Sequence, residues 1–311
     1  MNPTSSPFIR LSSEVVQAQA MGAPIVALES TVITHGLPYP ENIQAAQDME
    51  NEVRHRGAIP ATIAILEGMV HVGLNIEQLE HLASAKDLHK ASPRDFPRMI
   101  VNEKSGGTTV AGTIFIAHAV GIQVFATGGI GGVHRQPSWD ISADLPQLAK
   151  TPIIVVCAGA KAILDLPATL EYLETHAVPV VGYQTSEFPA FYSARSRLPT
   201  SSRADSPEEV VKLAHTHWQL GMTSALLVTV PPPPEVAMPE EEMRQAVKQA
   251  LQDAKNERIR GQRVTPYLLQ RVSELTGNAS LLANLGLLRN NADIAAQIAR
   301  SFKKDPKIKA I

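Results

Sequence analysis

Short apolar runs recur along the chain, separated by longer segments in which apolar and polar residues mix. The runs are rich in valine, isoleucine and alanine, which is typical of strands buried on both faces. We therefore predict strands at residues 24–28, 61–66, 124–126, 153–157, 178–181 and 225–230. A sheet with one solvated face would instead alternate apolar and polar residues.

The segments between these runs place apolar side chains at helical spacing. Residues 42–57 and 108–121 each stop at a glycine, which favours a helix end there. A third helix is expected at about 160–176, and the pattern is helical from Glu240 onward. Strands that alternate with helices in this way predict a layered α/β fold, with helices on both faces of the sheet.

The chain has 311 residues, 44% of them hydrophobic, which is enough for a large core. No long linker divides it, so we expect one domain over residues 1–311, with residues 1–10 flexible. The formal net charge is -2, and no basic run is interleaved with aromatic residues. This balance argues against nucleic-acid binding and favours a small ligand.

The single cysteine, Cys157, cannot form an intramolecular disulfide, and its apolar neighbours indicate a small buried side chain. The N-terminal residues lack the pattern of a signal peptide. No apolar run approaches the roughly 20 residues that span a bilayer, so no membrane association is expected. We expect a cytoplasmic protein.

Two candidate catalytic residues follow predicted strands, where ligands bind in layered α/β folds. Glu29 stands at the end of the first strand. It is either an acid that caps a turn or, in partly apolar surroundings, a proton donor with a raised pKa. Lys161 follows the strand at 153–157 and a turn of small residues. Most lysines lie on helix surfaces, but a partly desolvated amine near a helix N-terminus suits a Schiff-base nucleophile.

Two glycine-containing segments are candidates for phosphate or ligand contact. Residues 105–110 lead into a predicted helix, where free N–H groups and hydroxyls form a phosphate cradle, or where Thr108 is an ordinary N-cap. Residues 126–135 contain two glycine pairs, but His134 stands where the dinucleotide fingerprint needs its third glycine. A P-loop lysine is also missing, so neither NAD nor ATP is supported.

Two acidic residues, Asp140 and Asp144, lie four positions apart after the second glycine-containing segment. Two carboxylates this close can hold a hard divalent cation, and water molecules complete its coordination shell. One of them can equally cap a helix that begins near Pro146.

Several motifs resemble those of one enzyme family, from about Val26 to Ala299. They are Glu29-Ser30-Thr31, Thr34-His35-Gly36, Pro60 to Ala64, Ala126 to Arg135, Asp140 to Leu145, Val155 to Lys161, Gly182 to Thr185, Ala237 to Pro239, Thr265 to Leu269 and Asn290 to Ala292. On these residues the chain resembles the pseudouridine-5′-phosphate glycosidases, also called the indigoidine synthase A-like family. It departs from the family in a slightly short segment before Asp140, and in Pro93, where a basic residue is usual.

The resemblance implies a three-layer α/β/α sandwich around a mixed, largely parallel sheet, and assembly as a homotrimer. It makes Glu29 the proton donor, Lys161 the covalent nucleophile and Asp140 the ligand of a manganese ion (Mn2+). The substrate-binding residues that it implies are Lys90, Val110, Ser142, Ala143, Asp144 and Asn284.

The implied reaction is the reversible cleavage of the C–C glycosidic bond of pseudouridine 5′-phosphate, which gives uracil and ribose 5-phosphate. Carbon offers no leaving-group oxygen to protonate, so two carboxylates alone do not suffice and a Schiff base on Lys161 is expected. The alternatives are another Schiff-base lyase or aldolase acting on a sugar phosphate, a relative acting on a different C-nucleotide, and a non-catalytic nucleotide sensor.

Overall fold

The computed structural model describes residues 6–135, 140–259 and 264–304, and within them eleven strands form one sheet. The strands are β1 Ile9–Leu11, β2 Ile25–Leu28, β3 Ile59–Leu66, β4 Met69–Val72, β5 His89–Ala91, β6 Gly106–Thr108, β7 Val124–Ala126, β8 Ile154–Cys157, β9 Val180–Tyr183, β10 Ser202–Ala204 and β11 Leu226–Thr229. The helices are α1 Ser13–Ala20, α2 Glu41–His55, α3 Ile76–Ser84, α4 Phe96–Val101, α5 Val110–Ala119, α6 Asp144–Leu148, α7 Leu166–Thr175, α8 Pro207–Gln219, α9 Glu240–Asn256, α10 Val264–Leu275 and α11 Ala279–Lys304. A π-helical turn, η2, covers Val32–Gly36, and a 3-10 turn, η3, covers Pro93–Asp95.

The sheet is mixed and largely parallel, as the resemblance implies. Its main path runs β1-β4-β3-β2-β7-β8-β11-β9-β10, and β6 pairs with both β3 and β5. Only the β3–β4 and β3–β6 pairings are antiparallel among the described strands. The central strands are buried along their whole length, which explains their uniform apolar pattern.

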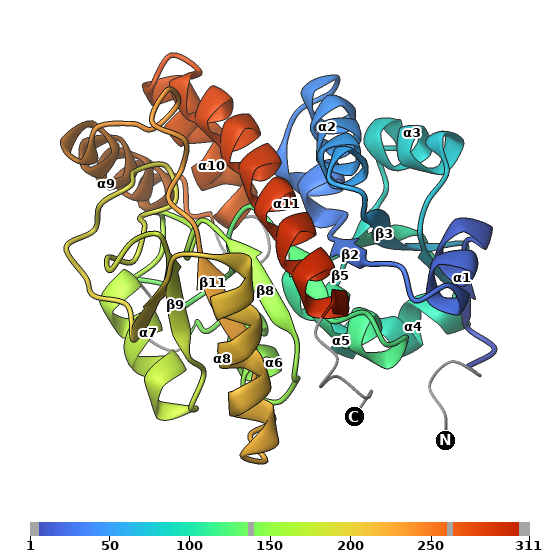
Figure 1. Cartoon of the computed structure of the whole chain (residues 1–311). Coiled ribbons are helices and arrows are strands. Elements are labelled where there is room, and N and C mark those ends of the chain that lie inside the picture. The colour runs from blue at the N-terminus through green and yellow to red at the C-terminus, as the bar shows by residue number, and fades with distance from the viewer. Residues whose placement is uncertain (1–5, 136–139, 260–263, 305–311) are drawn as a thin grey trace.

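Helices cover both faces of this sheet, which confirms the three-layer arrangement (Figure 1). The long helix α11 crosses one face, where it packs against β2, β7 and β8 and touches α2 and α8. Helices α5 and α6 pack against each other on the opposite face, and α5 contacts β2 and β3. Helix α2 connects strands in one direction along the sheet, and α5 and α6 connect strands in the other direction. Because crossovers between parallel strands are right-handed, these two groups of helices lie on opposite faces.

The direction of the chain reverses between β2 and β7. From β2 the chain passes through α2 to β3 on one side, and after α5 it returns to β7 on the other side of β2. Such a reversal opens a crevice beyond the carboxyl ends of the two strands, which is where ligands bind in open α/β sheets.

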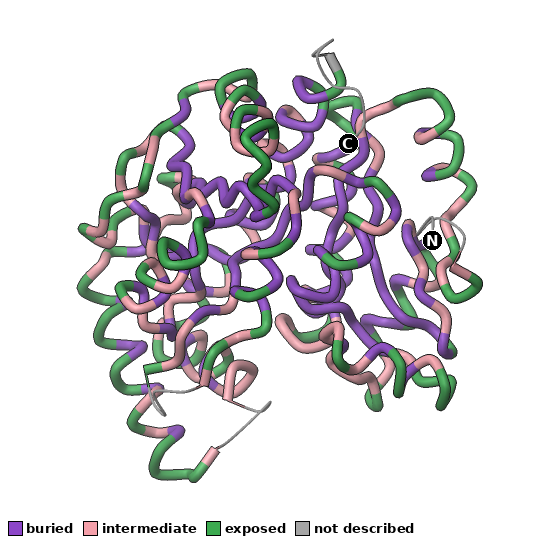
Figure 2. The backbone as a smooth tube through the Cα atoms, turned by 90° about the horizontal axis from the view of Figure 1, so that it is seen from below, coloured by how far each residue is buried: buried purple, intermediate pink, exposed green. Residues whose placement is uncertain are grey.

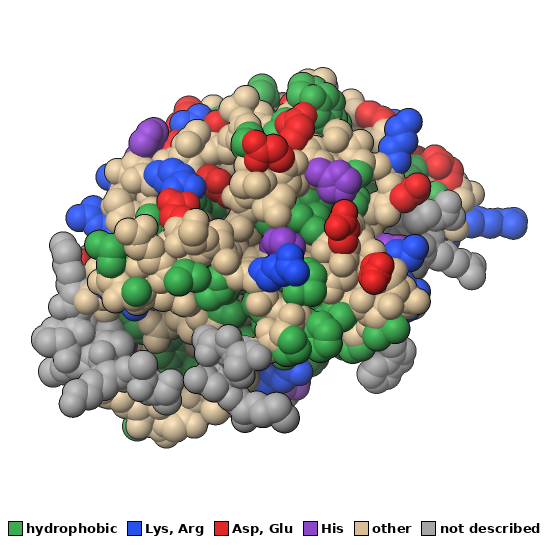
Figure 3. Space-filling model, turned by 90° about the vertical axis from the view of Figure 1, so that its right-hand side faces the viewer, with side chains coloured by type: hydrophobic (Ala, Val, Ile, Leu, Met, Phe, Trp, Pro, Cys, Tyr) green, Lys and Arg blue, Asp and Glu red, His purple; other side chains and the backbone are tan. Residues whose placement is uncertain are grey.

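Buried residues lie mainly in the sheet and on the helix faces that pack against it, and exposed residues lie mainly on the outer faces of the helices (Figure 2). Cys157 is fully buried in β8, as expected, and desolvation raises the pKa of its thiol to about 12. On the face in Figure 3, acidic and basic side chains are interspersed and not segregated. No helix in the described part of the chain has the length and apolar character needed to cross a membrane.

Three local expectations need correction. The helix expected from about residue 160 begins at Leu166, because Asp165 caps it and Pro167 occupies its first turn. Thr108 ends a strand, and the N-cap of α5 is Thr109, whose side chain accepts from the Gly112 N–H.

The third expectation, a flexible segment over residues 1–10, conflicts with a strand that begins inside it. Strand β1 begins at Ile9 and pairs in parallel with β4, while residues 1–5 lie outside the described residues. Pro93 begins the 3-10 turn η3, where a missing N–H is tolerated.

Candidate active site

Glu29 lies at the carboxyl end of β2, in the crevice between β2 and β7. Its side chain is only 5% exposed, and burial raises the pKa of its carboxyl group. The positive charges of Lys161 and Lys90 and a hydrogen bond from Thr127 oppose this shift, while the negative charge of Asp144 adds to it. A carboxyl group in such a place holds its proton to higher pH than an exposed glutamate does.

Lys161 follows β8, the strand that pairs with β7 on the side away from β2. Its backbone N–H donates to the Ile130 carbonyl at 3.1 Å, and Ala160 forms a parallel bridge with Ile130. The lysine therefore belongs to an extended segment that continues the sheet and does not start a helix. No ion pair within 4.0 Å joins Glu29 and Lys161, both of which the structure describes.

Lys90 approaches the same point from β5, which pairs with β6. Burial lowers the pKa of its ammonium group, and the positive charge of Lys161 lowers it further. The charges of Asp144 and Glu29 act in the opposite direction. The four side chains Glu29, Lys90, Asp144 and Lys161 thus act on one another in one partly buried cluster.

Asp144, expected as a substrate ligand, joins two segments of the protein. One carboxylate oxygen accepts from the Ala111 N–H at 2.9 Å, and the other accepts from the Gly131 N–H at 2.7 Å. The side chain is buried, and its own N–H donates to Ser142 Oγ at 3.2 Å. Asp144 therefore connects the N-terminus of α5 to the glycine-containing segment after β7.

The glycines of that segment serve close packing within the protein. A Cβ atom on Gly131 would lie 2.2 Å from Ser142 Oγ and 2.7 Å from Asp144 Oδ2. A Cβ atom on Gly129 would lie 2.5 Å from the ring of Phe191. We expected these glycines to let the backbone approach a ligand closely. At both positions, the atoms that come close are those of the protein itself.

The remaining expected site residues surround this cluster. Ser142 donates its N–H to the Gly132 carbonyl at 3.0 Å, and Ala143 is the exposed N-cap of α6. Val110 begins α5, and its N–H has no hydrogen-bond acceptor within the described ranges. Asn284 on α11 is buried, with its Oδ1 3.6 Å from the place a Cβ on Gly128 would occupy.

Asp140 lies at the edge of the cluster, beside His134. The His134 N–H donates to the Asp140 carbonyl at 2.9 Å. Burial lowers the pKa of the His134 ring, and the charge of Asp140 opposes this shift. Within the described ranges, no group of three or more His, Cys, Asp or Glu side chains has the arrangement of a metal cage.

Three residues near the site carry no role in the sequence-based expectation. Thr127 follows β7 and donates its hydroxyl to Glu29. Asn291 on α11 donates to the Thr127 carbonyl at 2.8 Å. His35 lies in η2, where burial and then the charge of Lys90 lower its pKa. The position of Thr127 directly after a strand was a signal of the same kind that identified Glu29.

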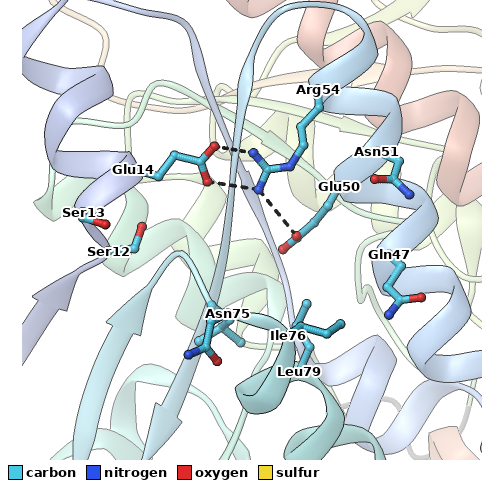
Figure 4. Close-up of a pocket in the computed structure, with 11 residues that line it drawn as sticks. Ser12, Ser13, Glu14, Gln47, Glu50, Asn51, Arg54, Asn75, Ile76 and Leu79 are labelled. Atoms are coloured by element: carbon cyan, nitrogen blue, oxygen red, sulfur yellow. Dashed lines mark hydrogen bonds and ion pairs between the residues drawn. The ribbon is translucent and has the colours of Figure 1, made fainter.

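A separate pocket of about 500 Å³ lies between α1, α2 and the start of α3 (Figure 4). Arg54 pairs there with Glu14, and one of its nitrogens is 4.0 Å from Glu50. Glu50 also accepts from Thr62 Oγ1 at 2.6 Å. These charges are satisfied by protein groups, and none of the expected catalytic residues lines the pocket. We therefore place the active site at the crevice between β2 and β7.

The fold and this cluster define an α/β enzyme that combines a buried acid with two lysines. A family model described as "Indigoidine synthase A like protein" matches residues 14–301. The chain belongs to this family.

The chain is similar over nearly its whole length to curated members of the family. It is 52% identical to the pseudouridine-5′-phosphate glycosidase of Geobacillus kaustophilus, over 95% of this chain and 99% of that protein. It is 47% identical to the enzyme of the same name from Petrotoga mobilis, over 97% and 99% of the two chains.

Solved structures give the same result for the fold. The prealnumycin C-glycosynthase AlnA, solved in complex with ribulose 5-phosphate, has a TM-score of 0.88 and 39% identity, covering 96% of this chain and 98% of that chain. An indigoidine synthase A-like protein from Thermotoga maritima has a TM-score of 0.88 and 34% identity, covering 96% and 97%.

Proposed function

We propose that this chain is a pseudouridine-5′-phosphate glycosidase, which cleaves the C–C glycosidic bond to give uracil and ribose 5-phosphate. The observation that carries the proposal is that the charge of Lys161 acts on the buried acid Glu29 at the carboxyl ends of β2 and β8, which flank β7 in the sheet. Relatives about half identical in sequence bear this enzyme name.

Lys161 acts as the nucleophile. The ribose ring opens as the ring oxygen leaves the anomeric carbon and takes a proton, and the lysine nitrogen bonds to that carbon. A proton then adds to carbon 5 of the base. The C–C bond breaks with its electron pair returning to uracil, while the nitrogen lone pair forms the imine. Water adds to the imine and releases ribose 5-phosphate and the free amine.

Glu29 supplies the proton to carbon 5. Its raised pKa lets the carboxyl group hold its proton to higher pH than an exposed glutamate does, which suits a proton donor.

Lys90 and the start of α5 hold the phosphate. The Lys90 ammonium group is partly buried, so its attraction for a phosphate dianion is less screened than at the surface. The Val110 N–H at the helix start adds a donor. Ser142 and Ala143 complete the contacts to the sugar phosphate, and Asn284 has amide groups suited to the edge of uracil.

A divalent manganese ion would be held by the Asp140 carboxylate. A half-buried carboxylate such as Asp140 can hold a hard cation that keeps several waters and uses substrate oxygens as further ligands. When bound, the ion would polarise and orient substrate oxygen atoms.

The same site would join uracil to ribose 5-phosphate, since the reaction is reversible. An aldolase acting on a sugar phosphate would use the same lysine and phosphate contacts without recognising uracil. Competition by uracil for binding of pseudouridine 5′-phosphate separates these two functions. Assembly as a homotrimer and a cytoplasmic location stay predictions, and light scattering of the purified protein tests the first.

Uracil release from pseudouridine 5′-phosphate, measured with added Mn2+ and with EDTA, tests the proposed function. The wild-type enzyme should release uracil with Mn2+ and lose activity in EDTA. Lys161→Ala should abolish turnover and also abolish trapping of ribose 5-phosphate by borohydride, because no amine remains to form the imine. The matched variant Lys150→Ala, at an exposed lysine, should keep both. Turnover by folded Lys161→Ala would disprove the role of Lys161.

A further inference from the structure

The hydroxyl group of Thr127 contacts the proposed proton donor directly. Thr127 is fully buried at the end of β7, and its Oγ1 donates a hydrogen bond to Oε1 of Glu29. Oε2 of Glu29 has no hydrogen-bond partner among the described residues. The two carboxyl oxygens therefore have different surroundings, although they are chemically equivalent in a free glutamate.

The backbone around Thr127 is fixed from both sides. Its N–H donates to the Val156 carbonyl at 3.0 Å. Asn291 Nδ2, on α11, donates to the Thr127 carbonyl at 2.8 Å and to the Gly128 carbonyl at 3.3 Å. Asn291 is fully buried, and its Oδ1 has no partner within the part of the chain that the structure describes. The amide group of Asn291 is thus oriented by these two carbonyl groups.

We propose that Thr127 is a positioning residue that places the acid proton of Glu29 on Oε2, and that Asn291 holds Thr127 for this task. The inference rests on the proposed function of Glu29 as the proton donor.

The reason lies in the two oxygens of a protonated carboxyl group. One is a carbonyl oxygen, which accepts hydrogen bonds well, and the other carries the proton and donates it. A hydroxyl group that donates to Oε1 favours the form in which Oε1 is the carbonyl oxygen. The proton then resides on Oε2, to which no described residue forms a hydrogen bond, and from there it transfers to carbon 5 of the base. Proton transfer requires such a defined donor geometry.

The same hydrogen bond also acts on the titration of Glu29. It lowers the pKa of the carboxyl group, against the larger effect of burial. The charged groups that face Glu29 are Lys161, Lys90 and Asp144, and a substitution at Thr127 changes none of them. Loss of the hydroxyl should therefore raise the pKa of Glu29 further while it removes the preference for Oε2.

Thr127→Val, which keeps the shape and removes the hydroxyl, is the test, with Thr127→Ser as the conservative variant. We expect kcat of Thr127→Val to fall on the order of 10- to 100-fold, a part of the ~10²–10⁴ that a general acid contributes. KM should change little, because the phosphate contacts remain. The alkaline limb of the kcat–pH profile should move to higher pH in Thr127→Val and return in Thr127→Ser. Borohydride should trap ribose 5-phosphate on Lys161 equally in all three proteins.

A merely structural Thr127 would lower trapping and kcat together and leave the alkaline limb in place, and this result would overturn the inference. Unchanged kcat in Thr127→Val would overturn it as well.

If Thr127→Val does not fold, infrared difference spectra of the resting wild-type protein against Glu29→Gln test the inference. A neutral carboxyl band with a hydrogen-bonded carbonyl supports the inference, and the absence of a neutral band near neutral pH overturns it. A wild-type protein that releases no uracil would disprove the proposed function, while the infrared spectra would still report on Thr127.

Discussion

Glu29 illustrates how position alone changes the chemistry of a common side chain. Thirty acidic residues are present in the chain, and several exposed ones, such as Glu241 and Glu274, have pKa values lowered by hydrogen bonds from neighbouring side chains. At Glu29 burial outweighs two nearby lysines and a hydrogen bond, so the pKa is raised. Desolvation dominates here because the favourable charges are not in ion-pair contact with the carboxyl group.

Glu29→Gln should remove the proton donor and keep the shape of the side chain. We expect kcat for uracil release to fall about 10²- to 10⁴-fold, while borohydride still traps ribose 5-phosphate on Lys161, because imine formation needs the amine and not the acid at carbon 5. Steady-state kinetics and mass spectrometry measure the two effects. Equal loss of both would contradict the assigned role.

The same variant tests the raised pKa through stability. In the wild type, the contribution of Glu29 is fully present below the ordinary glutamate pKa of about 4.3, and it is lost as pH rises through the raised folded-state value. Glutamine does not ionise, so stability of Glu29→Gln relative to wild type should increase from about pH 5 to about pH 8. Urea unfolding at the two pH values measures this difference.

At the scale of elements, the sequence pattern predicts the central strands well and the edges poorly. The runs at 24–28, 61–66 and 153–157 are long and apolar, so strands form there as predicted. Strands β5, β6 and β10 consist mostly of polar residues and glycine, so no apolar run indicates them. The start of α7 was predictable, because Asp165 followed by Pro167 is the signature of a helix N-terminus.

The residues of the candidate site also fall into those that the sequence indicates and those that only the fold brings together. Glu29 and Lys161 were candidates from the sequence because each follows an apolar strand. The bonds of Asp144 to Ala111 and Gly131 were not predictable, since they join segments that only the fold brings together. Asn291 reaches Thr127 only because α11 crosses the sheet at that point.

Asp144→Asn should loosen the connection between α5 and the glycine-containing segment. An amide has one oxygen, so one of the two N–H groups at Ala111 and Gly131 loses its acceptor, at a cost of about 1–3 kcal/mol. Urea denaturation measures the free energy of unfolding. The control Asp205→Asn, at an exposed ion pair with Arg203, should change it by less than about 1 kcal/mol. Equal effects of the two substitutions would argue against the connecting role of Asp144.

At the scale of the molecule, α11 connects the two halves of the sheet. It packs on β2, β7 and β8. Its Arg289 forms a salt bridge with Glu52 of α2, and its Asp293 forms one with Arg56, the C-cap residue of α2. Exposed pairs of this kind contribute little on their own, so the apolar contacts of the helix dominate.

Two leucines of α11 allow a matched test of this view. Leu288→Ala, at a side chain 1% exposed and packed over Gly128, should lower the free energy of unfolding by about 2–5 kcal/mol and lower activity with it. Leu282→Ala, at a side chain 62% exposed, should change it by no more than about 0.5 kcal/mol. Urea unfolding with parallel uracil-release assays measures both, and similar losses from the two variants would show that α11 does not anchor the sheet through its buried face.

The hydrogen bonds from Asn291 to Thr127 and from Thr127 to Glu29 bridge 164 and 98 residues of sequence. During synthesis on the ribosome, Glu29 and Lys161 emerge long before α11 does. A nascent chain can form its early strands while it grows, but the positioned acid depends on residues made much later. Catalytic competence should therefore appear late and abruptly during translation, so incomplete chains released by stalled ribosomes should be inactive even where their strands have folded.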